Sequence, residues 1–230
     1  MSITLSQTLT TQIDRTVEAA LDRKFRPDPL IGAELSRTQS LLGSLQKRHG
    51  GIIHHAIVEA VGESRYHTVL PVNGFTVSAA ADRMAESGAR ATCLRTDLPY
   101  SDEAAPGARR LRPDLITLDH RDGIVRGYEI KRGAGMVDAG KARQLERDLL
   151  CTRMLARSYA ESLGYQVHGA DAKAIFFYGQ HRFPEELALV SADLDDHFGV
   201  PVTGLVSAAT TYFQQRISAA LPAVVKGAAA

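Results

Sequence analysis

The sequence has only two cysteines, Cys93 and Cys151, among its 230 residues. They lie far apart and neither belongs to a C-x-x-C motif, so the sequence offers no disulfide framework and no pattern of zinc ligands. We expect both to be reduced, partly buried thiols, because a free cysteine behaves as a small apolar side chain.

Long apolar runs are missing as well. Runs such as residues 174–178 are far shorter than the roughly 20 residues that cross a bilayer as a helix. The N-terminus lacks the basic start and the continuous apolar stretch of a signal peptide. We therefore expect a cytoplasmic protein that does not associate with a membrane.

Motifs of several common enzyme classes are also absent. The sequence contains no G-x-S-x-G elbow, no P-loop, no dinucleotide-binding fingerprint after a strand and no H-E-x-x-H. A serine hydrolase of the α/β-hydrolase type, a P-loop NTPase and a zincin are therefore disfavoured.

Charge of one sign is not in excess, since the formal net charge is +1. The chain as a whole is not attracted to nucleic acid, but its charges are unevenly distributed. Residues 141–157 carry five basic and two acidic side chains, whereas residues 171–200 carry two basic and six acidic ones. The first segment is typical of a face that tolerates a polyanion, and two ordinary solvated helix faces are the alternative interpretation.

Hydrophobic spacing predicts an α/β protein. The N-terminal part favours helices at 5–24, at 33–48 (ending at Gly50-Gly51) and at 52–61. Strands are expected at 66–72, 75–78, 115–118, 124–130, 172–178 and 200–206, and further helices at 138–163, 184–198 and 208–221. For residues 79–110 we predict no element. The alternation indicates a central mixed β-sheet flanked by helices, with 1–50 as a helical N-terminal extension and 51–226 as the core.

One hairpin carries the residues best suited to chemistry. Its strands, 115–118 and 124–130, are joined by a turn that contains Asp122-Gly123. Side chains alternate along a strand, so Glu129 and Lys131 share one face, where unpaired charge would be costly to bury. If Asp114 approaches Glu129, two carboxylates converge beside an ammonium group. Such oxygen ligands suit Mg²⁺, although an exposed edge with a simple salt bridge is the alternative.

This pattern resembles the PD-(D/E)XK nuclease superfamily, with Pro113-Asp114 as PD and Glu129-Ile130-Lys131 as ExK. The resemblance covers roughly residues 52–178. It implies a restriction-endonuclease-like core in which a helix precedes a mixed sheet and another helix follows the hairpin. It also implies that Asp114, Glu129 and the carbonyl of Ile130 bind the metal, and that Lys131 is catalytic.

Further residues are candidates because such families often carry additional polar groups on the flanking helices. Glu59, on the helix before the sheet, is expected to support the metal, and His55 lies four residues earlier on the same helix face. Secondary candidates are Lys141 and Gln144 on the helix after the hairpin, together with Arg132 and Arg112. The arginines at 109, 110 and 112 could clamp a phosphate or form an ordinary basic loop.

The resulting hypothesis is a Mg²⁺-dependent (Mn²⁺ also possible) endonuclease that hydrolyses double-stranded DNA. A type II restriction endonuclease is preferred, acting as a homodimer because cutting both strands needs two sites. A cognate methyltransferase would then act without physical contact. The alternatives are a Holliday-junction resolvase or DNA-repair nuclease, a catalytically silent DNA-binding or assembly module, and a nuclease that acts on RNA.

Overall fold

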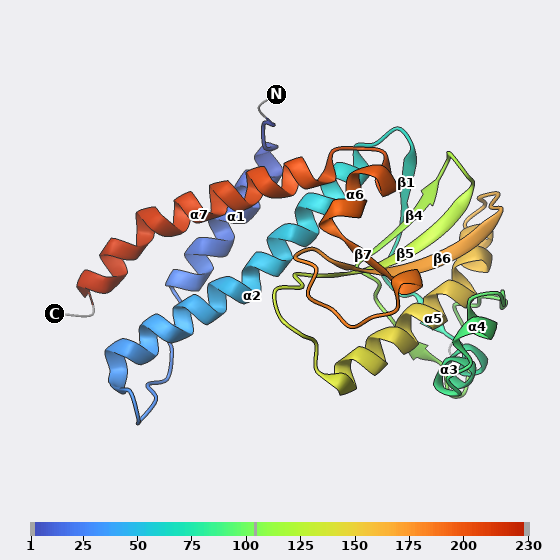
Figure 1. Cartoon of the computed structure of the whole chain (residues 1–230), viewed down its shortest axis with the longest axis horizontal. Helices are drawn as coiled ribbons and strands as arrows, with labels where there is room; N and C mark the ends of the chain where they lie inside the picture. Colours follow the sequence, from blue (N-terminus) through green and yellow to red (C-terminus); the bar gives the residue numbers. More distant parts are fainter. Residues whose placement is uncertain (1–2, 104, 228–230) are drawn as a thin grey trace. The chain divides into compact units, whose positions relative to one another are not determined.

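The computed structural model describes residues 3–103 and 105–227 (Figure 1). The chain forms two compact units, one made of Met1–Ala60 with Pro201–Ala230 and the other of Val61–Val200. These divisions differ from the expected 1–50 and 51–226, because the C-terminal helix belongs to the same unit as the N-terminal one. None of the helices within the described residues is long and apolar enough to cross a membrane.

The first unit consists of helices. Helix α1 (Gln7–Leu21) begins after Ser6, whose hydroxyl oxygen accepts a hydrogen bond from the amide of Leu9 at 3.0 Å. Its apolar positions recur every three or four residues and are buried, as the spacing predicted. They are Leu9, Ile13, Val17 and Ala20. Helix α1 contacts α7 (Val202–Gly227).

Helix α2 (Gly32–Gly62) is continuous, so the predicted break at Gly50-Gly51 is wrong. A glycine inside a helix costs only about 1 kcal/mol, and this helix buries a long row of apolar side chains on both sides of that pair. These include Leu41, Leu45, Ile52, Ile53 and Ile57. Tertiary burial therefore outweighs the weak local propensity.

The second unit is built on a five-stranded mixed sheet, which confirms the expected α/β class (Figure 1). The strand order is β1 (His67–Leu70), β4 (Leu115–Asp119), β5 (Ile124–Lys131), β6 (Gly169–Phe176) and β7 (Ala188–Val190). Strand β4 is antiparallel to both β1 and β5, whereas β6 is parallel to β5 and β7 is parallel to β6. Helix α5 (Ala139–Ser162) is the crossover between β5 and β6.

Two helices identify the faces of the sheet. On one face, α5 approaches so closely that a Cβ atom added to Gly127 would lie 2.3 Å from Cγ2 of Thr152. On the other face, the ring of Tyr128 lies 5.2 Å from that of Phe198 in α6 (Ser191–Phe198). Because side chains alternate, Glu129 must lie on the same face as Gly127, toward α5.

Three segments differ from the sequence-based expectation. Residues 79–110 contain α3 (Ala79–Glu86), α4 (Arg90–Cys93) and β3 (Arg109–Arg110), which pairs with β2 (Thr76–Val77) in a separate small sheet. The predicted helix 184–198 is a 3-10 turn (Glu185–Leu187), strand β7 and α6. The predicted strand 200–206 is wrong, because α7 is one helix from Val202 onward.

Candidate active site

The structure brings Asp114, Glu129 and Lys131 together at one end of the sheet. Asp114 directly precedes β4, and its amide donates to the carbonyl of Tyr128 in β5 at 3.0 Å. The Nζ atom of Lys131 lies 2.9 Å from Oε2 of Glu129 and 3.6 Å from Oδ2 of Asp114. The two carboxylates therefore converge on one ammonium group, in the arrangement that the hairpin predicted.

The ionisation of this group follows from its partial burial. The side chain of Glu129 is only 16% exposed. Burial raises the pKa of Glu129 above its usual value of 4.5, against the opposing effect of the Lys131 ammonium. Burial alone would lower the pKa of Lys131, but the two adjacent carboxylates outweigh it and raise that pKa. Lys131 is therefore an ammonium ion at neutral pH.

A backbone oxygen lies on the same side of β5 as Asp114. Oδ2 of Asp114 accepts a hydrogen bond from the amide of Ile130 at 2.6 Å. In a β-strand the N–H and C=O of one residue point toward the same neighbouring strand. The carbonyl of Ile130 is therefore directed to the side where the Asp114 carboxylate lies. A third oxygen ligand of a cation held by Asp114 would need this direction.

These donors fit a small hard cation. Two carboxylates and a carbonyl are all oxygen ligands, and Mg²⁺ is usually held by one or two carboxylates with several water molecules. Within residues 3–103 and 105–227, no group of three or more acidic, histidine or cysteine side chains is arranged to hold a metal. The side-chain contribution in the second unit is thus a pair, Asp114 and Glu129.

The two candidates on α2 have partners within the first unit. Oε2 of Glu59 accepts a hydrogen bond from the hydroxyl of Ser6 at 2.7 Å. Nε2 of His55 lies 3.3 Å from the side-chain amide nitrogen of Gln12. A contribution of either residue to the metal site stays a prediction.

A polar network that the sequence did not reveal lies beside Glu129. Oδ1 of Asp148, on α5, accepts a hydrogen bond from the side-chain amide of Gln144 at 2.9 Å and another from the guanidinium of Arg109 at 2.6 Å. Arg109 also donates to Asp82 of α3 at 2.9 Å. The negative charge of Asp148 contributes to the raised pKa of Glu129. A predictive signal existed, because residues 144 and 148 lie on one face of a helix.

This network changes the interpretation of the arginine cluster before Asp114. Arg109 joins α3 to α5 and is not available as a phosphate clamp. Arg110 donates to the carbonyl of Gly74. Arg112 is exposed, and of the three arginines it alone forms neither a hydrogen bond nor an ion pair through its side chain among the described residues.

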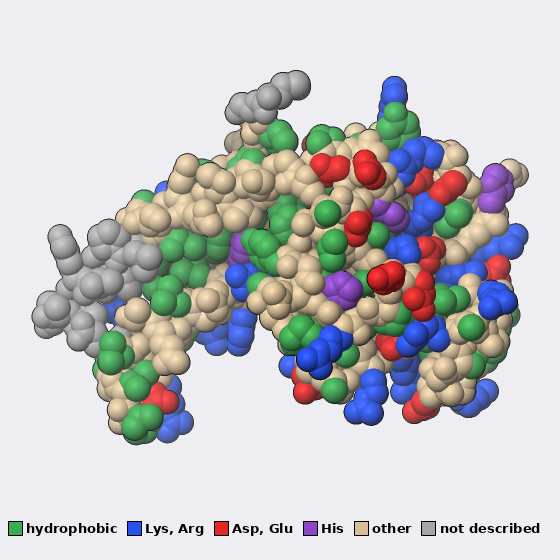
Figure 2. Space-filling view, viewed as in Figure 1, with side chains coloured by type: hydrophobic (Ala, Val, Ile, Leu, Met, Phe, Trp, Pro, Cys, Tyr) green, Lys and Arg blue, Asp and Glu red, His purple; other side chains and the backbone are tan. Residues whose placement is uncertain are grey.

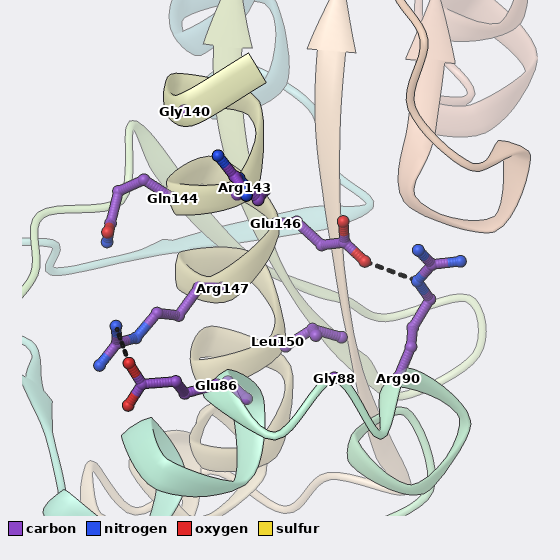
Figure 3. A pocket seen from close by; sticks show the side chains of 10 residues that line it. Glu86, Gly88, Arg90, Gly140, Arg143, Gln144, Glu146, Arg147 and Leu150 are labelled. Carbon is purple, nitrogen blue, oxygen red and sulfur yellow. Dashed lines mark hydrogen bonds and ion pairs between the residues drawn. The ribbon is translucent and has the colours of Figure 1, made fainter.

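A pocket of about 480 Å³ lies between α3, α4 and the first half of α5 (Figure 3). Two ion pairs flank it, Arg90 with Glu146 at 2.6 Å and Arg147 with Glu86 at 3.4 Å. Gln144 lines the pocket and also contacts Asp148. Four of its five charged lining residues are ion-paired, and the fifth, Arg143, forms no ion pair among the described residues.

Uncompensated cations gather at the end of the sheet that holds Asp114 and Lys131. The start of β4, the ends of β5 and β6, and the start of α5 all lie at this end, as the strand directions require. Five cationic side chains from these segments form no ion pair within the part of the chain that is described. They are Arg112, Arg132, Lys141, Arg143 and Arg182. Figure 2 shows lysine and arginine side chains along the edge where α5 begins.

Several arginines elsewhere in this unit are ion-paired with carboxylates. Arg121 and Arg126 contact Asp119, and Arg153 contacts Asp97 at 2.7 Å. The five cations without an ion pair at the end of the sheet favour a polyanionic ligand there.

Comparisons of the chain with protein-family models, with curated proteins and with solved structures found no match.

Proposed function

We propose that this chain is a Mg²⁺-dependent nuclease that hydrolyses phosphodiester bonds in DNA. The observation that carries the proposal is the convergence of Asp114 and Glu129 on Lys131 where the hairpin ends. The element order supports it, because a helix before a mixed sheet and a further helix after the hairpin are what the resemblance to PD-(D/E)XK nucleases implies.

Asp114, Glu129 and the carbonyl of Ile130 would hold the cation. When bound, Mg²⁺ polarises a phosphate oxygen and lowers the pKa of a water molecule. The Asp114 carboxylate is oriented by its hydrogen bond from the Ile130 amide, and Glu129 by its bond from Lys131. Both carboxylate side chains are therefore held in position before a cation binds. Binding then costs less side-chain conformational entropy.

Lys131 acts through its positive charge. Its raised pKa keeps it protonated, so an electrostatic role suits it better than that of a general base. Hydrolysis adds water across the phosphorus–oxygen bond, and negative charge increases on the phosphate oxygens as the bond to the leaving oxygen breaks. An ammonium group beside those oxygens stabilises this charge.

The surrounding cations favour a polyanion over a small phosphoester. A strand of DNA presents successive phosphates, and each one neutralised by a lysine or arginine adds a salt-dependent contribution to binding. Arg112, Arg132 and Lys141 flank the centre without competing carboxylates among the described residues. Restriction of duplex DNA by a homodimer, and a separate methyltransferase, stay predictions, as does the repair or junction-resolving alternative.

The experiment is a cleavage assay on duplex, branched and single-stranded DNA, and on RNA, with Mg²⁺ or with EDTA. Wild-type protein is compared with Asp114→Asn and Glu129→Gln. We expect cleavage of DNA that requires Mg²⁺ and that falls by at least about 100-fold in either variant.

The other outcomes have definite meanings. Binding of DNA without cleavage of any substrate would contradict the nuclease proposal and favour a silent binding module. Cleavage of RNA under conditions that leave every DNA intact would replace the proposed substrate. Cleavage that persists in both variants would show that another site is responsible.

A further inference from the structure

We propose that Arg132 and Tyr178 form a platform on which an unpaired base of the substrate stacks, at the same end of the sheet as the phosphate that is cut. The inference rests on the proposed nuclease function and names its substrate class, a nucleic acid with unpaired nucleotides at the cleavage site. Arg132 follows Lys131 directly, so alternation directs its side chain to the opposite face at the end of β5, and Tyr178 lies in the loop after β6.

The platform is fixed to the catalytic strand by backbone hydrogen bonds. The amide of Phe177 donates to the carbonyl of Lys131 at 3.1 Å, and that of Tyr178 donates to Arg132 at 3.0 Å. The next contact joins Gln180 to Gly133 at 2.9 Å. The pairing thus continues past the strand ends, so a ligand on Tyr178 would be held in a defined position relative to Lys131.

Gly133 makes this close pairing possible. Its φ is +65°, and a Cβ atom at this position would lie 3.0 Å from backbone atoms of Phe176. A larger residue would push the two loops apart.

The guanidinium of Arg132 contacts the Tyr178 ring, but one of its N–H groups has no hydrogen-bond partner among the described residues. Its central carbon lies 5.7 Å from the centre of the Tyr178 ring, within range of a cation–π contact. Its Nε atom is buried and has no hydrogen-bond partner among the described residues. A buried donor without a partner is costly, and the partly exposed side chain would have to turn for Nε to donate to a phosphate or base oxygen.

Tyr178 supplies the aromatic surface. It is 43% exposed, although large apolar side chains are usually covered. An aromatic ring beside an arginine is the combination on which single-stranded nucleic acids stack, because every base has a π-face. A base inside a duplex is already stacked on both sides, so only an unpaired base can use the platform.

The same unit contains a second arginine–tyrosine pair, with the same distance between guanidinium and ring, that serves as a comparison. Arg121 lies over the ring of Tyr66, also at 5.7 Å, at the opposite end of the sheet. Its guanidinium, however, donates to Asp119 and to the carbonyl of His197. That pair is internally satisfied and is expected to bind no base.

The absence of tryptophan from the chain permits a direct test. Tyr178→Trp creates a protein with one tryptophan, and Tyr66→Trp is its control. Both are titrated in EDTA, which prevents cleavage, with a ten-residue deoxythymidine strand and with a ten-base-pair duplex. We expect the single strand to quench emission from the first variant, while the duplex has little effect and the control does not respond.

Affinity gives a second readout. Tyr178→Ala should weaken binding of the single strand about tenfold, within the range for loss of one base–aromatic stack. Tyr178→Phe keeps the ring and should bind like the wild type. Equal affinity of Tyr178→Ala and wild type for the single strand, or unchanged emission of Tyr178→Trp on binding, would overturn the inference.

Failure of the inference can be distinguished from failure of the proposed function. If wild type and Tyr178→Ala cut duplex and single-stranded DNA equally well in Mg²⁺, the nuclease stands and the platform does not. If the wild type neither binds nor cuts any of these nucleic acids, both proposals fail. If the wild type prefers unpaired or branched DNA and Tyr178→Ala loses that preference, a repair or junction-resolving role is favoured over restriction of intact duplex.

Discussion

Replacement of Gly127 by alanine tests how α5 is held over the catalytic strand. The added Cβ would meet Cγ2 of Thr152 at 2.3 Å, well inside van der Waals contact. Thr152 is buried, and its hydroxyl donates to the carbonyl of Asp148 at 2.8 Å, so its side chain cannot rotate away without losing that bond. We expect Gly127→Ala to destabilise the protein.

The magnitude follows from two opposing effects. Overpacking in a core costs about 1–3 kcal/mol, whereas replacing a glycine inside a strand with alanine gains about 0.5–1 kcal/mol. The net loss in the wild type should be about 1–2 kcal/mol. In a Thr152→Ser background Cγ2 is absent and the nearest remaining atom, Cβ, lies at 3.6 Å. There the same Gly127→Ala change should stabilise by about 0.5–1 kcal/mol.

The assay is equilibrium urea unfolding of the wild type, the two single variants and the double variant. The predicted sign reversal corresponds to a coupling free energy of about 2 kcal/mol between the two positions. If Gly127→Ala has the same effect in both backgrounds, α5 does not approach β5 in the way described. The position of Asp148 beside Glu129 would then also be in doubt.

Three further predictions concern charge. Asp119 is buried and forms an ion pair with Arg121. Burial would raise the pKa of its carboxyl group, but the hydrogen bonds from Arg121 outweigh this and lower it to about 2. The carboxylate therefore contributes stability above pH 4 that is lost as the pH falls toward 2. Asp119→Asn should remove about 2 kcal/mol at pH 7 and abolish that pH dependence in urea unfolding. Arg109→Gln should cost about 2 kcal/mol or more, because it leaves two partly buried carboxylates without their shared partner. The surface control Arg157→Gln should cost much less, because ion pairs exposed to solvent contribute little, and equal losses would contradict the distinction. Finally, Glu129 must be ionised to bind a cation, and burial raises its pKa above 4.5. As the pH is lowered, the rate of Mg²⁺-dependent cleavage should therefore begin to fall before pH 4.5 is reached. A rate that stays constant down to pH 4.5 would refute this.

The hairpin was predictable because its signals are local. Asp122-Gly123 marks the turn, alternation places Glu129 and Lys131 on one face, and the β-rich run of residues 115–118 follows Asp114. The α5 helix was also predictable, since Asp138 caps it through a bond from the amide of Gly140 at 2.9 Å. These features need no knowledge of the rest of the chain.

Other elements depend on contacts between distant residues. The β-branched valines at 200, 202 and 206 suggested a strand, but Val202, Val206 and Ala209 are buried at helical spacing in α7. The short strand β7 exists because it pairs with β6, and β3 because it pairs with β2. Local propensity is too weak to specify such segments.

The candidate site was likewise only partly predictable. The hairpin indicated the pair of carboxylates and the lysine, but Asp148 and Asp82 come from helices that the sheet brings beside Glu129 and Arg109. Tyr178 joins Arg132 only because β6 is parallel to β5 in a register that pairs Lys131 with Phe176. Such register is set by packing across the sheet and not by the local sequence.

The central claim is tested most directly by single-turnover cleavage of DNA in Mg²⁺ by Lys131→Ala and Lys173→Ala. Both remove one ion-paired lysine from the same sheet, since Lys173 of β6 lies 3.4 Å from Asp171 of the same strand. The account predicts that Lys131→Ala loses at least about 100-fold in rate, while Lys173→Ala cleaves within about threefold of the wild type. Equal rates for the two variants would contradict the assignment of Lys131 to the active site.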